Sequence, residues 1–212
     1  NANMLFVDGG SDHVNIGTSS DLGGTFNVSG TAVISTADNL DTLTLISTDA
    51  DANVGPNLRL YRNSSSPADD DFLGAIEFEG RNDNSQDFVA ARLFAYATDV
   101  SDGSEDATLQ IGMMKAGSQH LAVEITPDAL IINNGGLDLD FRVESNGNAN
   151  MLFVDGGNDA IGIAGSTISG ANTVLQVNGD MRVENSVVLT GRESAATPSH
   201  SFHDDADTGM FN

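Results

Sequence analysis

One ten-residue phrase, NANMLFVDGG, occurs twice in this chain of 212 residues, at residues 1–10 and again at 148–157. The similarity continues after both copies, because apolar residues recur at matching places. The corresponding positions are Val14 with Ile161, Ile16 with Ile163, and then, after a slip of two residues, Phe26 with Leu175, Val28 with Val177 and Gly30 with Gly179. A unit of about thirty residues is therefore repeated, and such repeats are typical of chains that stack or assemble rather than form one large core.

The repeated unit reads as a set of short strands separated by turns. Apolar and polar residues alternate over three or four positions, and this period of two indicates half-buried strands. The chain has 23 Gly and only 4 Pro, so its turns depend on residues that tolerate positive φ angles. It has no Trp, and only 10 Phe and 2 Tyr are available to fill an interior. We therefore predict a mostly β fold without a large single-chain core.

Strands as short as these cannot cover their own apolar side chains, such as Leu5, Val7, Val14 and Ile16. The two copies of the unit are not adjacent in the sequence, so stacking along the chain does not cover them either. Identical strands from other chains, arranged in parallel around a common axis, would cover them and would protect the strand edges. We expect an obligate homo-oligomer, specifically a homotrimer, in which the repeats form intertwined β-shaft or β-helix-like segments.

The charge of the chain is strongly negative, with 8 Lys and Arg against 31 Asp and Glu and a formal net charge of −23. Such a surface is repelled by nucleic acid and by anionic membranes, and the few cations are scattered along the sequence. No apolar run is long enough to span a bilayer. We predict no nucleic-acid partner and no membrane insertion. The absence of Cys excludes disulfides and Cys-based metal sites.

Three regions follow one another along the chain: a shaft repeat at residues 1–37, an inserted globular β module at 38–136, and a second shaft repeat at 137–212. The middle module has longer strand candidates and polar turns, which predict an antiparallel sandwich or meander. Its strand candidates are residues 42–46, 57–61, 73–79, 89–97, 108–114, 121–126 and 130–133. The alanines of residues 88–97 would also allow a helix, but helix caps are absent and we favour a strand. Because the chain begins inside a repeat and without Met, we expect it to be part of a longer polypeptide.

Several phrases resemble tail fibre proteins of tailed bacteriophages, especially phages of marine bacteria, including cyanophage-like ones. MLFVDGGNDAIGI at residues 151–163 is similar to their shaft repeats. NLRLYRNSSSPAD at 57–69, LGAIEF at 73–78 and DGSED at 102–106 resemble a domain common in the same fibres. PSHSF at 198–202 and DADTGMF at 205–211 are similar to the segment that leads into a trimerising or self-cleaving C-terminal chaperone domain. Because the sequence stops at Asn212, that domain lies outside it.

The resemblance implies a homotrimeric virion appendage, extracellular, that contacts the bacterial surface at adsorption. Its implied partners are itself, other virion tail proteins, and a bacterial surface glycan or outer-membrane receptor. Two alternatives remain open: a cellular trimeric adhesin or extracellular filament, and a polysaccharide depolymerase tailspike segment. An adhesin needs secretion and an anchor, whereas a depolymerase needs catalytic carboxylates. For lateral contact with a host we favour the polar loops at residues 64–71 and 99–106, because loops on a rigid scaffold commonly carry binding.

Enzymatic and metal-binding patterns are weak in this sequence, and we assign no catalytic, cofactor-binding or metal-binding residues. Glu77 and Glu79 are two apart on a strand candidate, at a spacing of roughly 7 Å that glycosidases can use, but a solvated strand face explains them more simply. Asp49, Asp51 and Asn53 begin like a calcium loop, which then lacks its glycine and its glutamate. Residues 199–207 hold the ingredients of a nucleophilic triad in Ser199, His200, Ser201, His203, Asp204, Asp205 and Asp207, but adjacent residues alone do not make one. His203, Asp204, Asp205 and Asp207 could gather around a trimer axis as a metal cluster, although a solvated turn explains them more simply. His13 and His120 are single and flanked by strand residues, and the glycines of 162–170 do not fit a dinucleotide loop.

Overall fold

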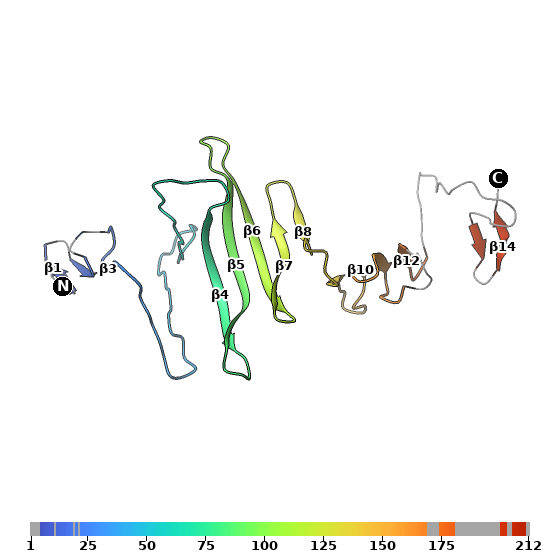
Figure 1. The fold of residues 1–212 in the computed structure, drawn as a ribbon, viewed down its shortest axis with the longest axis horizontal. Helices are drawn as coiled ribbons and strands as arrows, with labels where there is room; N and C mark the ends of the chain where they lie inside the picture. The colour runs from blue at the N-terminus through green and yellow to red at the C-terminus, as the bar shows by residue number, and fades with distance from the viewer. Residues whose placement is uncertain are drawn as a thin grey trace. The chain divides into compact units, whose positions relative to one another are not determined.

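The computed structural model describes residues 5–10, 12–18, 20, 22–168, 174–180, 200–202 and 205–210. For Asp8 and for the last two of these ranges it describes the backbone alone. Every regular element within the described residues is a β-strand, and the strands form separate sheets, none of them closed (Figure 1). The prediction of a mostly β fold is confirmed at this level.

The first repeat forms a three-stranded sheet. Strands β1 (Leu5–Asp8) and β2 (His13–Ile16) make an antiparallel hairpin, and β3 (Phe26–Val28) lies parallel to β2. The register pairs Leu5 with Ile16, and Val14 with Phe26. The amide of Val14 also donates to the carbonyl of Thr25 at 2.8 Å, which ties the start of β3 to β2.

The second repeat builds the same sheet from β10 (Leu152–Asp155), β11 (Ala160–Ile163) and β12 (Leu175–Val177). Here Leu152 pairs with Ile163, and Ile161 pairs in parallel with Leu175, which are the equivalents of the pairs in the first copy. An additional strand, β9 (Phe141–Val143), pairs antiparallel with β10. The prediction that the whole unit recurs, beyond the ten-residue phrase, is therefore confirmed.

Local backbone conformation also repeats between the two units. The hairpin loops place Asp12 and Asp159 at φ angles of 58° and 54°. Just after β2 and β11, Gly17 and Ala164 have φ angles of 80° and 60°. The second copy therefore holds an alanine where the first has a glycine, in a region of φ that glycine adopts without strain.

The middle of the chain forms a five-stranded antiparallel meander in the order β4-β5-β6-β7-β8 (Figure 1). The strands are β4 (Phe72–Arg81), β5 (Asp87–Asp99), β6 (Asp106–Lys115), β7 (Ser118–Ile125) and β8 (Leu130–Ile132). Aromatic and β-branched residues alternating along these strands favour this structure. Between β6 and β7, Ala116 and Gly117 have φ angles of 50° and 82°, as a two-residue hairpin with a type I′ turn requires. Five of the seven predicted strands are thus present, and the ambiguous stretch 88–97 is a strand.

Two predicted strands are wrong. Residues 42–46 and 57–61 belong to no sheet, and Ile46 and Leu58 are 77% and 64% exposed. An alternating pattern makes a strand only where another strand supplies hydrogen-bond partners, and within the described residues none pairs with these segments. Between them the backbone bonds to nearby side chains instead: the Asp51 and Asn53 amides donate to the carboxylates of Asp49 and Asp51.

The chain divides into two compact units, residues 1–59 and 60–212. The region boundaries predicted at residues 37 and 136 stay predictions. In the second unit, β13 (His200–Phe202) and β14 (Asp205–Met210) form a further antiparallel pair.

Very little apolar surface is buried within the chain. Among the described residues, the buried apolar side chains are Phe94, Ala97, Phe153 and Ala160. A core this small agrees with the composition, which offers few large apolar residues. Most of the large apolar side chains on the strands are left partly or wholly exposed in the single chain.

Candidate interaction surfaces

One face of the meander, which we call the apolar face, is formed by three rows of cross-strand neighbours. Directly paired residues of antiparallel strands lie on the same face of a sheet. The three rows run Gly74, Ala95, Leu109, Ile125, Leu130; then Ile76, Leu93, Ile111, Val123, Ile132; then Phe78, Ala91, Met113, His120. No Asp, Glu, Lys or Arg belongs to any of the three rows.

The apolar face is open to solvent in the single chain. Phe78 is 62% exposed, Met113 is 51% exposed and Leu130 is 66% exposed. One end of the first row has a neighbour, because a β carbon added to Gly74 would lie 3.0 Å from Cβ of Leu60. The extended segment that carries Leu60 is fixed by Arg62, which forms an ion pair of 2.8 Å with Asp71. Soluble monomers rarely leave so many neighbouring apolar side chains uncovered.

The opposite face of the meander, which we call the mixed face, carries aromatic and polar side chains that contact one another. The ring of Phe72 lies 5.7 Å from the rings of both Phe94 and Tyr96, centre to centre. The guanidinium carbon of Arg92 lies 4.4 Å from the centre of the Phe94 ring, within the range of a cation–π contact. Phe94 itself is buried. On the mixed face these side chains therefore pack against one another within the single sheet.

A buried carboxylate on the mixed face also has its partners. Glu124 is 7% exposed, and it accepts a hydrogen bond of 2.7 Å from the side-chain amide of Gln110. The side-chain amide of Asn134 donates to its other oxygen. A carboxylate buried in this way is stable only when such donors replace water. On the mixed face, therefore, the buried carboxylate has its hydrogen-bond donors within the same chain.

A small cavity of about 210 Å³ opens on the mixed face. It is lined by Arg92, Phe94, Gln110, Gly112, Gln119, His120 and Leu121. Within it, Nε of Arg92 is buried and has no hydrogen-bond partner. A guanidinium over an aromatic ring, beside side-chain amides, can bind a small polar group.

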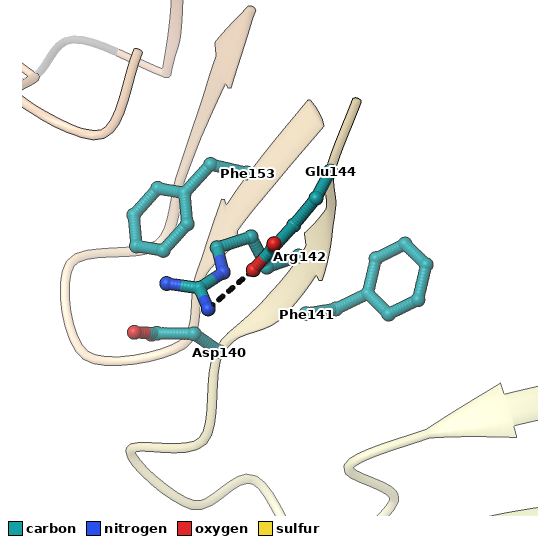
Figure 2. A pocket seen from close by; sticks show the side chains of 5 residues that line it. All are labelled: Asp140, Phe141, Arg142, Glu144 and Phe153. Carbon is teal, nitrogen blue, oxygen red and sulfur yellow. Dashed lines mark ion pairs between the residues drawn. The ribbon is translucent and has the colours of Figure 1, made fainter. Parts of the chain in front are cut away.

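A second polar pocket lies where β9 pairs with β10, and its volume is about 430 Å³ (Figure 2). Arg142 and Phe153 are direct cross-strand partners, and Arg142 forms an ion pair of 2.6 Å with Glu144. Asp140, Phe141, Arg142, Glu144 and Phe153 line the pocket, and in Figure 2 the ring of Phe141 points away from the other four side chains. One oxygen of Asp140 accepts from the Gly156 amide at 3.1 Å. A guanidinium can donate hydrogen bonds to a hydroxyl-rich or amide-bearing ligand, two carboxylates can accept them, and an adjacent aromatic ring offers an apolar contact.

The two loops that the sequence analysis favoured for lateral contact, residues 64–71 and 99–106, meet at one end of the meander. The amide of Val100 donates to the carboxylate of Asp69 at 3.0 Å, and the amide of Asp70 donates to the carbonyl of Ala97 at 2.7 Å. The amide of Ser101 donates to Asp99, and this hydrogen bond holds the pKa of the Asp99 carboxyl below its usual value. The loops thus form one acidic surface, whose role in host contact stays a prediction.

The weaker sequence candidates are not brought together into a site. Glu77 and Glu79 are both exposed, and the β4–β5 register shifts between Phe78 and Glu79. Asp49 and Asp51 bind nearby backbone amides, and the amide of Asn53 keeps the pKa of Asp51 below its usual value. In the described part of the chain, no three His, Asp or Glu side chains are grouped to hold a metal ion. The side chains of residues 199–207 lie outside the description, so the cluster predicted there is not assessed.

Sequence reasoning missed the apolar face and the Arg142 pocket. The alternation in 73–79 and 108–114 is a signal for the first, because it places one set of apolar residues on one side of each strand. Nothing in the sequence indicates that Arg142 faces Phe153, since their pairing depends on the register of β9 against β10.

Comparison with known proteins finds no family model that matches this chain and no curated protein that matches it. Within the residues that the structure describes, no helical segment has the length and hydropathy needed to cross a bilayer.

Proposed function

We propose that this chain is a structural and host-recognition segment of a tailed-bacteriophage tail fibre, and that it acts as a homotrimer that contacts the bacterial surface during adsorption. One observation carries the proposal: a three-stranded unit occurs twice with the same pairing, and in its first copy the apolar side chains are largely uncovered in the single chain. In the first copy Leu5, Val7 and Phe26 are 63%, 65% and 66% exposed.

The physical argument for association is that uncovered strands require partners. Each repeat sheet has three or four short strands, which is too few to bury an apolar face without a second layer. Repeated units of identical design in identical chains can supply that layer to one another by rotation about an axis. Three linked copies would also raise the avidity of any weak host-binding site.

The host-recognition part of the proposal draws on the polar surfaces. The acidic loop surface at residues 64–71 and 99–106 and the Arg142 pocket both lie on scaffolds held by sheet pairing. A net charge of −23 disfavours a polyanionic receptor without bridging cations, so we expect neutral or zwitterionic glycans, or protein receptors, to bind best.

The first test is the solution mass of the chain, measured by light scattering over a range of concentrations. We expect a constant mass of three times the 22.0 kDa chain. A folded monomer at every concentration would contradict the proposal. The assignment to a virion is tested separately, with antibodies against the chain and electron microscopy of phage lysates and of uninfected cells. Labelled tail fibres are expected, whereas labelled cell surfaces would support the adhesin alternative.

A further inference from the structure

We propose that the apolar face of the β4–β8 meander is the surface through which copies of this chain associate, with the apolar face of one copy packed against the apolar faces of the others. This inference rests on the proposed homo-oligomer and names the surface that holds it together. The row of Ile76, Leu93, Ile111, Val123 and Ile132 crosses all five strands and forms the centre of that surface.

The difference between the two faces of the sheet shows which one requires a partner. On the mixed face, Phe94 is buried under Arg92 and Phe72, and the carboxylate of Glu124 is bound by Gln110. On the apolar face, Phe78, Met113 and Leu130 are each more than half exposed, and the neighbour shown outside the sheet is Leu60, beside Gly74. A sheet with one such face is stable when a second layer covers it.

The area of the apolar face is sufficient for a specific interface. Seven of its large side chains are more than a third exposed: Ile76, Phe78, Leu109, Ile111, Met113, Ile125 and Leu130. Taking about 200 Å² for each side chain when fully exposed, they present roughly 700 Å² per chain, close to the roughly 800 Å² per partner of a standard interface. The interior of such a patch also lacks charged residues, as the centres of homo-oligomer interfaces do.

The charge pattern of the chain is compatible with a second copy as the occupant of the apolar face. Each chain carries a net charge of −23, so two copies repel one another wherever carboxylates would meet. The rows of the apolar face contain no acidic or basic residue, so identical faces can meet there without bringing like charges into contact. The same packing also supplies the second layer for each copy at once, which a partner binding elsewhere would not do.

Two adjacent methionines provide a test in the unmodified protein. Met113 lies on the apolar face and is 51% exposed in the single chain. Met114 pairs with Gln119 on the mixed face and is only partly exposed. The single chain therefore predicts that Met113 is oxidised faster than Met114, whereas association through the apolar face predicts the reverse order.

The experiment is oxidation by dilute hydrogen peroxide, read peptide by peptide by mass spectrometry, at a concentration where light scattering has given the mass. We expect an oligomer in which Met113 is oxidised at least about tenfold more slowly than Met114, as an interface core excludes solvent. An oligomer in which Met113 reacts as fast as Met114 would overturn this inference and leave the proposed function standing. A monomer would overturn both, even if Met113 were protected by another part of its own chain.

Matched variants give a second readout. Met113→Asp places a carboxylate in the proposed interface, and we expect it to raise the concentration at which the oligomer dissociates by at least about 100-fold. Met114→Asp introduces the same charge next to it on the mixed face and is expected to leave the mass unchanged. Circular dichroism checks that both variants keep their β structure. If both variants dissociate equally, or if neither does, the apolar face is not the interface.

Discussion

Two buried asparagines hold the first repeat together, and removing one of them gives a sharp test of that sheet. Asn15 and Asn27 are cross-strand partners that are 2% and 6% exposed. The side-chain amide of Asn27 donates to the side-chain oxygen of Asn15 at 2.7 Å and to the carbonyl of Gly24 at 2.6 Å. Its own oxygen accepts from the amide of Gly24 at 3.2 Å. One side chain therefore satisfies three polar groups on β2 and on the turn before β3.

Substitution of Asn27 by alanine leaves those three groups without their partner. A buried polar group without a hydrogen bond destabilises a protein by about 1–3 kcal/mol, and water that enters the opened site reduces this loss. We expect Asn27→Ala to lower the local stability of the sheet by about 2 kcal/mol, which corresponds to an increase of about 30-fold in the opening equilibrium. Hydrogen exchange measures this directly at the amides of Val14 and Ser29, which bond across to Thr25 and Ile16.

The second repeat offers a matched control. Gln176 occupies the position of Asn27, but its side-chain amide donates to the carbonyl of Thr167 and to Asn178 at an exposed site. Gln176→Ala is therefore expected to change the hydrogen-exchange rate at the Ile161 amide by less than about fivefold, because water can replace the lost partner of an exposed polar group. If Asn27→Ala leaves exchange at Val14 within about a factor of two, the buried pair does not hold the sheet and the reasoning is wrong.

Three further changes test the local chemistry of the repeats. Gly17→Ala is expected to lower the free energy of unfolding by at least about 1 kcal/mol, because φ is 80° there and the added β carbon would lie 2.6 Å from the Ser29 carbonyl oxygen; an unchanged urea midpoint would contradict this. Ala164→Gly relieves the same backbone strain in the second copy and is expected to raise that free energy by up to about 1 kcal/mol, and a loss of stability would show that the methyl group packs usefully. The hydrogen bond from the side-chain amide of Asn158 is the main cause that lowers the pKa of Asp155. The contribution of this hydrogen bond to stability is therefore present above the unfolded pKa of Asp155 and is lost as pH falls through the lower folded pKa. Asn158→Ala should raise the pKa of Asp155 in an NMR titration.

The strands that the sequence predicts well are those whose pattern and partners agree. Residues 108–114 alternate, and the ambiguous residues 89–97 are flanked along the chain by further strands, so each pairs with its neighbour in sequence. Residues 42–46 show a similar alternation and form no strand, because pairing is a property of two segments and the pattern reports only one. The alternating pattern therefore predicts reliably which segments are able to form strands, but it predicts less reliably which of them find a partner strand.

The candidate surfaces were predictable in part for the same reason. The alternation in β4 and β6 indicates an apolar side, but the rows across five strands depend on register shifts such as the one between Ile111 and Gly112. The position of Arg142 opposite Phe153 depends on a strand of three residues, which carries too few residues for a pattern to be seen. Local hydrogen bonds, such as those that the backbone amides of Gly157 and Asn158 donate to the Asp155 carboxylate, follow from the sequence of the turn itself.

The repeated phrase shows where the local information in such a sequence ends. Both copies contain the same two glycines after the same aspartate, yet their surroundings differ. A β carbon on Gly156 would lie 2.6 Å from the Leu139 carbonyl oxygen, because residues before β9 pack against this turn, whereas nothing in the described part of the chain lies within 4 Å of one on Gly9. The strand pairing is therefore a property of the repeated unit of about thirty residues, since it is the same in both copies. The packing against Gly156 is a property of the preceding residues, and it gives that glycine a steric role that Gly9 does not have within this chain.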